Sequence, residues 1–95
     1  MALPTYVASG AIADLTAPGT VALPAGIQVN DILVLEIESA NQAVTITNQN
    51  GGTWTEVTDS PQGVGTAGGT TATRLTVFWS RYNGTQGAPT IEATP

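Results

Sequence analysis

The chain has 95 residues and a mass of 9.6 kDa, a size that suits one domain and leaves no room for a second. It contains no cysteine, histidine or lysine, which excludes disulfides, thiolate nucleophiles and ordinary zinc sites. Two basic and seven acidic residues give a net charge of −5, the wrong sign for phosphate backbones or anionic lipids, so we expect no nucleic acid and no membrane partner.

Residue composition predicts β structure throughout the chain. Threonine is the most abundant residue, and threonine and valine favour strands because branching at Cβ restricts χ1. The 11 glycines and 6 prolines prevent long helices, and no window repeats apolar residues at helical spacing. We therefore expect one all-β domain over residues 1–95, an antiparallel, jelly-roll-like β-sandwich of six or seven short strands with no significant helix.

The beginning of the chain is predicted to contain two weak segments. Residues 4–9 are expected to form an edge strand or part of an N-terminal arm over residues 1–10. Thr20–Leu23 is expected to form a short strand that stops at Pro24, because proline cannot donate to a ladder.

The strongest predicted strand covers Asp31–Ser39. Leu33, Leu35 and Ile37 alternate onto one face of it. The other face carries, in order, Ile32, Val34, Glu36 and Glu38. Because the first half of this second face is apolar, we expect it to be covered, which is typical of a central strand.

Four more strands are expected near residues 44–47, 53–58, 74–82 and 89–93. The first of them is followed by the turn cluster 48–52, whose Asn-Gly pair tolerates the positive φ that tight hairpin turns require. Trp54 and Val57 fall on opposite parity, so a bulge or an early strand end is expected there.

The Gly-rich stretch 60–71 is predicted to be a long, flexible loop, because little in it could anchor it. It lacks the lysine and the strand–helix context of a phosphate-binding loop. In the strand that follows, Leu75, Val77 and Trp79 share one face and Phe78 lies on the other.

No pattern of residues predicts an active site. Glu36 and Glu38 are the one close carboxylate pair, and a solvated or partner-facing strand face explains them better than glycoside chemistry or a cation site. Asp14, Asp31 and Asp59 do not match the spacing of a calcium loop. A hydroxyl nucleophile would lack a histidine or lysine base. We expect no enzyme activity, no cofactor and no metal.

The aromatic side chains allow two interpretations. Exposed on a sandwich face, Tyr6, Trp54, Trp79 and Tyr82 could stack on sugar rings. The preferred interpretation is structural: Trp79 packs in the core and Trp54 closes one end of the sandwich, since large aromatics dominate small cores.

Four short motifs carry a resemblance to a known family. They are Val21–Gly26 (V-A-L-P-A-G), Asn30–Leu35 (N-D-I-L-V-L), Gly52–Thr55 (G-T-W-T) and Leu75–Trp79 (L-T-V-F-W). The series resembles a β-sandwich module that recurs in structural proteins of tailed bacteriophages, including head decoration proteins and tail-fibre or receptor-binding parts. The resemblance covers roughly Thr20 to Ala93.

The chain departs from the family pattern at two places. Asn30 stands where the pattern usually has glycine, which is tolerable because asparagine readily adopts a left-handed conformation. The module usually continues beyond the position of Ile91 with further strands, so we expect an open edge to be covered by a neighbouring copy or by the N-terminal arm.

The resemblance implies a virion structural protein, a capsid decoration or cement protein that binds the major capsid protein and copies of itself as a homotrimer. Its candidate partner contacts are Leu3, Pro4, Tyr6, Trp54 and Tyr82. The alternative is a tail-fibre or receptor-binding module that recognises a glycan through Trp54, Tyr82 or residues 60–71. An unrelated bacterial adhesin or carbohydrate-binding protein is a third alternative.

The expected location is the virion, after synthesis in the host cytoplasm. Residues 1–10 carry no positive side chain, and the apolar run 32–35 is far shorter than a membrane span, so we expect no signal peptide and no transmembrane segment.

Overall fold

The structure is a computed structural model that describes residues 3–13 and 18–94. In this part of the chain it contains seven strands and no helix, as the all-β prediction requires. The strands are β1 (Gly19–Thr20), β2 (Ile32–Ser39), β3 (Ala43–Asn48), β4 (Thr55–Glu56), β5 (Gln62–Val64), β6 (Thr73–Arg81) and β7 (Thr90–Thr94). The first two residues of the expected arm, and Asp14, lie outside the described residues.

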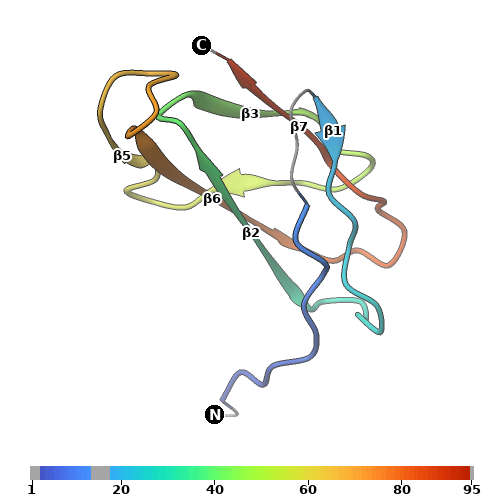
Figure 1. The fold of residues 1–95 in the computed structure, drawn as a ribbon. Helices are drawn as coiled ribbons and strands as arrows, with labels where there is room; N and C mark the ends of the chain where they lie inside the picture. The colour runs from blue at the N-terminus through green and yellow to red at the C-terminus, as the bar shows by residue number, and fades with distance from the viewer. Residues whose placement is uncertain (1–2, 14–17, 95) are drawn as a thin grey trace.

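The strands form two antiparallel sheets that face one another (Figure 1). One sheet has the order β1-β7-β3, and the other has the order β2-β6-β4 with β5 also paired to β6. The main core cluster lies between them and consists of Leu35, Val44, Phe78 and Ile91. The expected antiparallel sandwich is confirmed.

Strand β2 pairs with β6 over its whole length, from Ile32 opposite Arg81 to Ser39 opposite Arg74. Its inner face carries Leu33 and Leu35 into the core, as expected. The expectation that β2 is a central strand is wrong, because β3 belongs to the other sheet and leaves β2 at an edge.

The outer face of β2 is also more exposed than the sequence indicates. Ile32 is 54% exposed and Val34 is 61% exposed. The predicted cover on the first half of this face is absent from the described residues, since no described strand packs outside this sheet.

The inner face of β6 is the reverse of the one its apolar pattern suggests. Thr76, Phe78 and Ser80 are buried, whereas Trp79 is 39% exposed and Leu75 is 48% exposed. The expectation that Trp79 packs in the core is therefore wrong. The two small hydroxyl side chains leave space for Phe78 opposite Leu35, and Gln86 satisfies the hydroxyl of Ser80.

A bulge at Asn30 sets the start of β2. The amide of Asn30 donates to the carbonyl of Tyr82 at 2.8 Å, and the amide of Tyr82 donates to the carbonyl of Asp31 at 2.8 Å. Asn30 has a φ of 75°, the left-handed conformation that glycine adopts at the first position of such bulges. The prediction that asparagine is tolerated in place of glycine is confirmed.

The turn cluster 48–52 has the expected positive φ at Asn50 and Gly51. It does not form a hairpin, because it leads from β3 in one sheet to β4 in the other. Strand β4 is only two residues long, so the early strand end expected near Trp54 and Val57 is confirmed.

The Gly-rich stretch 60–71 contains β5, so the expectation of a long loop without regular structure is wrong there. The tip of this stretch forms hydrogen bonds with the segment between β2 and β3. The side chain of Asn41 donates to the carbonyl of Gly65, and the amide of Gly68 donates to the carbonyl of Ala40 at 2.8 Å. The signal that sequence reasoning missed is Asn41, which also accepts from Arg74 Nε at 2.9 Å.

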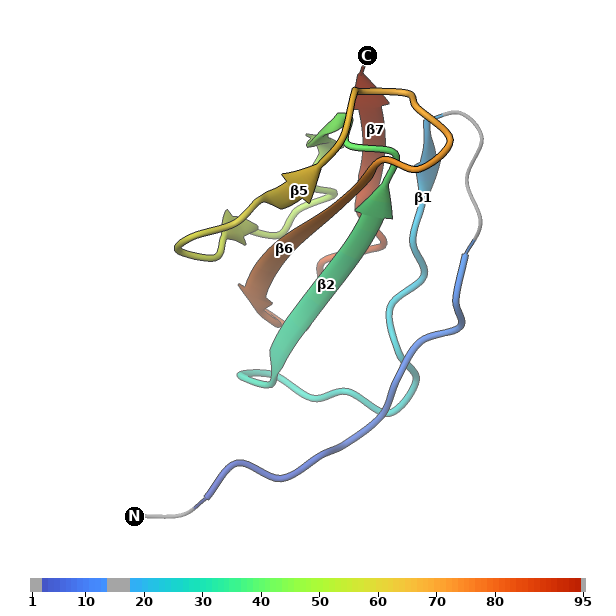
Figure 2. The same ribbon diagram turned by 60° about the vertical axis from the view of Figure 1, so that its left-hand side comes forward.

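The two terminal segments differ slightly from expectation. The strand predicted over Thr20–Leu23 is shifted to β1, and its ladder with β7 is extended by the amide of Val21, which donates to the carbonyl of Pro89 at 3.0 Å. Residues 3–13 form no strand and run as an extended arm along one side of the sandwich (Figure 2). Of the two alternatives for residues 4–9, the structure has the arm.

Asn30 provides a first test of the fold. Asn30→Ala should lower the free energy of unfolding by about 1 kcal/mol, because a Cβ without a hydrogen-bonding side chain is disfavoured at positive φ. Asn30→Gly should stay within about 0.5 kcal/mol of the parent. Urea denaturation measures both, and equal losses for the two variants would contradict the bulge.

Gln86 provides a second test. It is 4% exposed, its Nε2 donates to Ser80 Oγ at 3.1 Å, and its Oε1 accepts from the amide of Asn83 at 3.0 Å. Gln86→Ala should lower the free energy of unfolding by about 1–3 kcal/mol, because it leaves buried polar groups unpaired. The matched control Gln28→Ala, at an exposed position, should cost less than about 0.5 kcal/mol in the same denaturation experiment. Similar losses in both would contradict this role.

Candidate functional site

The acidic side chains do not form a reactive centre in the described part of the chain. Glu36 and Glu38 share the outer face of β2 and are exposed, and Glu38 Oε1 accepts a hydrogen bond from Thr73 at 3.0 Å. No group of three or more histidine, cysteine, aspartate or glutamate residues that could hold a metal ion occurs among the described residues. The pair is a charged edge on a strand face, which agrees with its preferred interpretation.

The most distinctive surface is the outer face of the four-stranded sheet, which we call the outer face. It comprises the apolar side chains of Ile32, Val34, Val64, Leu75, Val77 and Trp79. The register places Val34 directly opposite Trp79 on this face. All of these side chains are exposed except that of Val77, which is half-buried. Exposed apolar side chains that gather on one face mark interaction sites.

Charges on the outer face surround one uncharged strand pair. Arg81 lies opposite Ile32, and Glu36 and Glu38 lie opposite Val77 and Leu75, so Val34 and Trp79 form the pair without charge. The apolar centre of the face is therefore a small patch around Val34 and Trp79 with charges at its rim, as in many protein interfaces.

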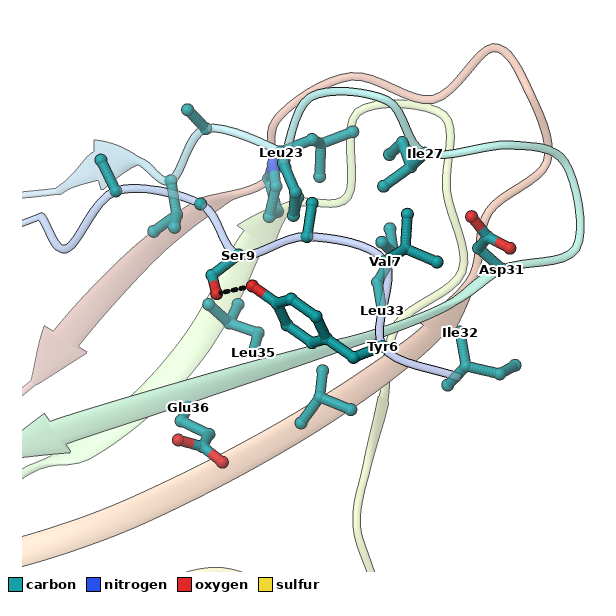
Figure 3. A pocket seen from close by; sticks show the side chains of 18 of the residues that line it. Tyr6, Val7, Ser9, Leu23, Ile27, Asp31, Ile32, Leu33, Leu35 and Glu36 are labelled. Atoms are coloured by element: carbon teal, nitrogen blue, oxygen red, sulfur yellow. Dashed lines mark hydrogen bonds between the residues drawn. The ribbon is translucent and has the colours of Figure 1, made fainter. Parts of the chain in front are cut away.

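A groove of about 850 Å³ lies on the open side of the sandwich, beside β2. It is lined by the arm on one side and by core residues that include Leu33, Leu35 and Ile91 on the other. Figure 3 shows the arm passing over its mouth, with the hydroxyls of Tyr6 and Ser9 joined by a hydrogen bond of 2.6 Å. The two sheets are thus open to solvent along this edge.

Four of the five candidate partner contacts line this groove. They are Leu3, Pro4, Tyr6 and Trp54. Leu3 is 83% exposed and Tyr6 is 79% exposed, so the arm side chains are available to a partner. Tyr82 does not line the groove; it is half-buried and holds the bulge at Asn30 through its backbone.

Trp54 is partly buried and packs against the core cluster, as its structural interpretation requires. Trp54 lies outside the strands, and its backbone amide donates a hydrogen bond to Gln49 Oε1 at 2.6 Å. The indole Nε1 is buried and has no hydrogen-bond partner in the described structure. Trp54 therefore closes the inner wall of the groove and leaves Trp79 as the more exposed tryptophan.

Sequence reasoning missed the outer-face residues of β6. The sequence predicts Trp79 in the core and places Leu75 and Val77 on the same face of the strand, which is its more apolar face. The available signal was the alternation of Thr76, Phe78 and Ser80, whose small polar members fit a thin core; Gln86 satisfies the hydroxyl of Ser80, and the buried hydroxyl of Thr76 has no partner among the described residues. Apolarity alone cannot distinguish a core face from a docking face.

Comparison of the chain with models of protein families, with curated proteins and with solved structures found no match. Within residues 3–13 and 18–94 there is no helix of the length and apolarity that crossing a membrane requires. The outer face and the groove are therefore the features of the molecule from which a function can be inferred.

The two tryptophans test the assignment of the outer face. Trp79→Phe leaves Trp54 as the only tryptophan, Trp54→Phe leaves Trp79, and selective excitation of tryptophan avoids emission from the two tyrosines. Acrylamide should quench the fluorescence of Trp79 more strongly than that of Trp54, because Trp54 packs against the core and Trp79 is partly exposed. Stronger quenching of Trp54 would contradict the observed orientation of β6.

Proposed function

We propose that this chain is a non-enzymatic virion structural protein, a decoration or cement protein that binds the outer surface of a capsid as a homotrimer and stabilises the shell. Its partners are the major capsid protein and other copies of itself. The observation that supports this proposal most directly is the exposed apolar patch of the outer face around Val34, Leu75 and Trp79, on a small domain whose described part has no metal-binding cluster.

The outer face suits repeated contacts on a lattice. Its valine and isoleucine side chains have few rotamers, so they lose little entropy when they are packed against a partner. The whole chain has only 9% charged residues, which limits the desolvation cost of covering much of its surface. A small interface becomes strong when several copies engage one lattice together.

The proposed mechanism is mechanical. Each copy places its outer face across neighbouring capsid subunits, and burial of Val34, Leu75 and Trp79 opposes their separation. The charges of Arg81, Glu36 and Glu38 around the patch fix its orientation rather than its affinity. The motifs of the tailed-phage module support the same role.

The first experiment is to locate the chain in virus particles. Particles are purified from the phage stock that carries the coding sequence, heads are separated from tails, and each fraction is measured by quantitative mass spectrometry. We expect the chain in the head fraction, at a fixed ratio to the major capsid protein. Its absence from heads would overturn the proposal.

The outer face is tested by a matched pair of variants. Leu75→Gln should weaken binding of the purified chain to heads roughly tenfold, because it removes an apolar contact from the buried patch. The control Val29→Gln changes an exposed apolar side chain in the loop before β2, away from the outer face, and should leave binding within about twofold. Sucrose-gradient co-sedimentation measures both, and equal effects would exclude the outer face as the contact.

The alternative function is a tail-fibre or receptor-binding module that recognises a glycan. The observation that favours it is the partly exposed ring of Trp79, which lies opposite Thr55 and Val34 and offers an apolar face to a sugar. Recovery of the chain in the tail fraction, with glycan-dependent quenching of Trp79 fluorescence, would favour this function over the first.

A further inference from the structure

The free edge of β2 presents unpaired backbone groups. Asp31 and Tyr82 form a hydrogen-bonded pair, and such pairs alternate along an antiparallel ladder. The odd-numbered residues of β2 therefore bond to β6, whereas the even-numbered ones, from Ile32 to Glu38, direct their amides and carbonyls away from it. No hydrogen bond to these backbone groups from another part of the chain occurs among the described residues. An open edge of this length is a template for another strand.

The N-terminal arm, residues 3–13, has the properties of a strand without a sheet. It is extended, and Leu3, Tyr6, Val7 and Ile12 are between 52% and 101% exposed. The radius of gyration is 14.0 Å, against about 12 Å for a compact domain of this length. The arm therefore extends beyond the body of its own sandwich, as Figure 2 shows.

We propose that the arm of one copy adds as an antiparallel strand to the free edge of β2 in the neighbouring copy and places Tyr6 in that copy's groove. This inference deepens the proposed function, because it identifies the contact that holds the homotrimer together. The partner is a second copy of this chain, and its contribution completes a site that is open in each single copy.

The position of Pro4 determines which side chains enter the groove. Proline has no amide hydrogen, so in an edge strand its nitrogen must point away from β2. Backbone direction alternates along a strand, so Thr5 and Val7 bond to β2 and Tyr6 does not. Opposite residues of an antiparallel pair share a face. Val7 beside Val34 therefore continues the outer face, and Tyr6 points inward beside Leu35.

Tyr6 suits the groove that it would enter. On the body of the sandwich the groove is lined by Leu33, Leu35 and Trp54, and its other wall is the chain's own arm, which the neighbour's arm would replace. A tyrosine brings a large apolar ring and a hydroxyl that can stay at the solvent-exposed rim. Its ring would pack beside Leu35 and keep this side of the core covered.

The direction of the arm favours a neighbouring copy over its own β2. Figures 2 and 3 show the arm running in the same sense as β2. Every strand pair of the two sheets is antiparallel. In a ring of three, neighbouring copies differ by a rotation of about 120°, which can bring a neighbour's arm much closer to the antiparallel orientation than the chain's own arm, and a bend of the arm completes the pairing. Three such contacts, each from one copy to the next, close into a ring that uses every arm and every edge.

The absence of cysteine from the chain makes a disulfide test direct. The double variant Val7→Cys/Val34→Cys is oxidised mildly and separated by non-reducing electrophoresis. Opposite residues in an antiparallel pair have Cα atoms about 5.5 Å apart, which permits a disulfide. We expect covalent oligomers up to a trimer, and a peptide cross-link between copies when the two single variants are mixed.

The matched control is Ala8→Cys/Val34→Cys. Ala8 has the opposite parity, so its side chain would lie on the other face of the added strand, and the yield of covalent oligomers should fall at least about fivefold. A disulfide confined to single chains would show that the arm pairs with its own body and would overturn the proposal. No disulfide, or equal yields from the two double variants, would overturn it as well.

A non-covalent measurement separates this inference from the proposed function. Tyr6→Ala should raise the dissociation constant of the oligomer roughly tenfold or more by light scattering, whereas Thr5→Ala should change it less than about threefold. If the cross-linked oligomer forms and does not bind heads, the arm exchange stands and the capsid role fails. If the chain binds heads as a monomer with an intrachain disulfide, the capsid role stands and the arm exchange fails.

Discussion

The ladder between β2 and β6 is the interaction on which the rest of the structure depends. It is the longest pairing in the described chain, and its register directs Leu35 and Phe78 into the core together. The bulge at Asn30 sets the start of this register, because a shift of one residue would exchange the two faces of β2. Strands β4 and β5 then take their positions from the opposite edge of β6.

The same ladder explains why the surface is unusual. Strand β2 is long enough to carry three core side chains, yet it gains only one neighbour, so its outer face and its free edge are both left to solvent. In a solitary protein these features would invite aggregation, because the strand edge is unpaired and the apolar side chains of Val34 and Trp79 are exposed. In a protein that functions in an assembly they are the sites at which assembly occurs. The two proposed contacts use one feature each: the lattice covers the outer face, and the arm covers the edge.

Local backbone chemistry was predictable from the sequence, whereas the partner of each strand was not. The left-handed Asn30, the turn at Asn50 and Gly51 and the inner face of β2 follow from properties of single residues or of strict alternation. The inward face of β6 was not predicted because Thr76 and Ser80 occupy its core positions, and the hydroxyl of Ser80 is satisfied by Gln86, which lies outside the strand. The groove could not be predicted from the sequence either. It exists because β2 and β1 are edge strands of different sheets and do not pair with one another.

The position of β7 has a consequence for how the protein is made. Strands β1 and β3 lie on either side of β7 and do not pair with one another, so their sheet has no ladder until β7 joins them. During synthesis the earlier strands leave the ribosome first, and β3 must wait with its apolar face uncovered through the whole production of β4, β5 and β6. Closure of this sheet therefore requires contacts between distant parts of the chain, which makes folding slow. Because the chain has only 9% charged residues, little charge repulsion opposes aggregation through that uncovered face during the interval.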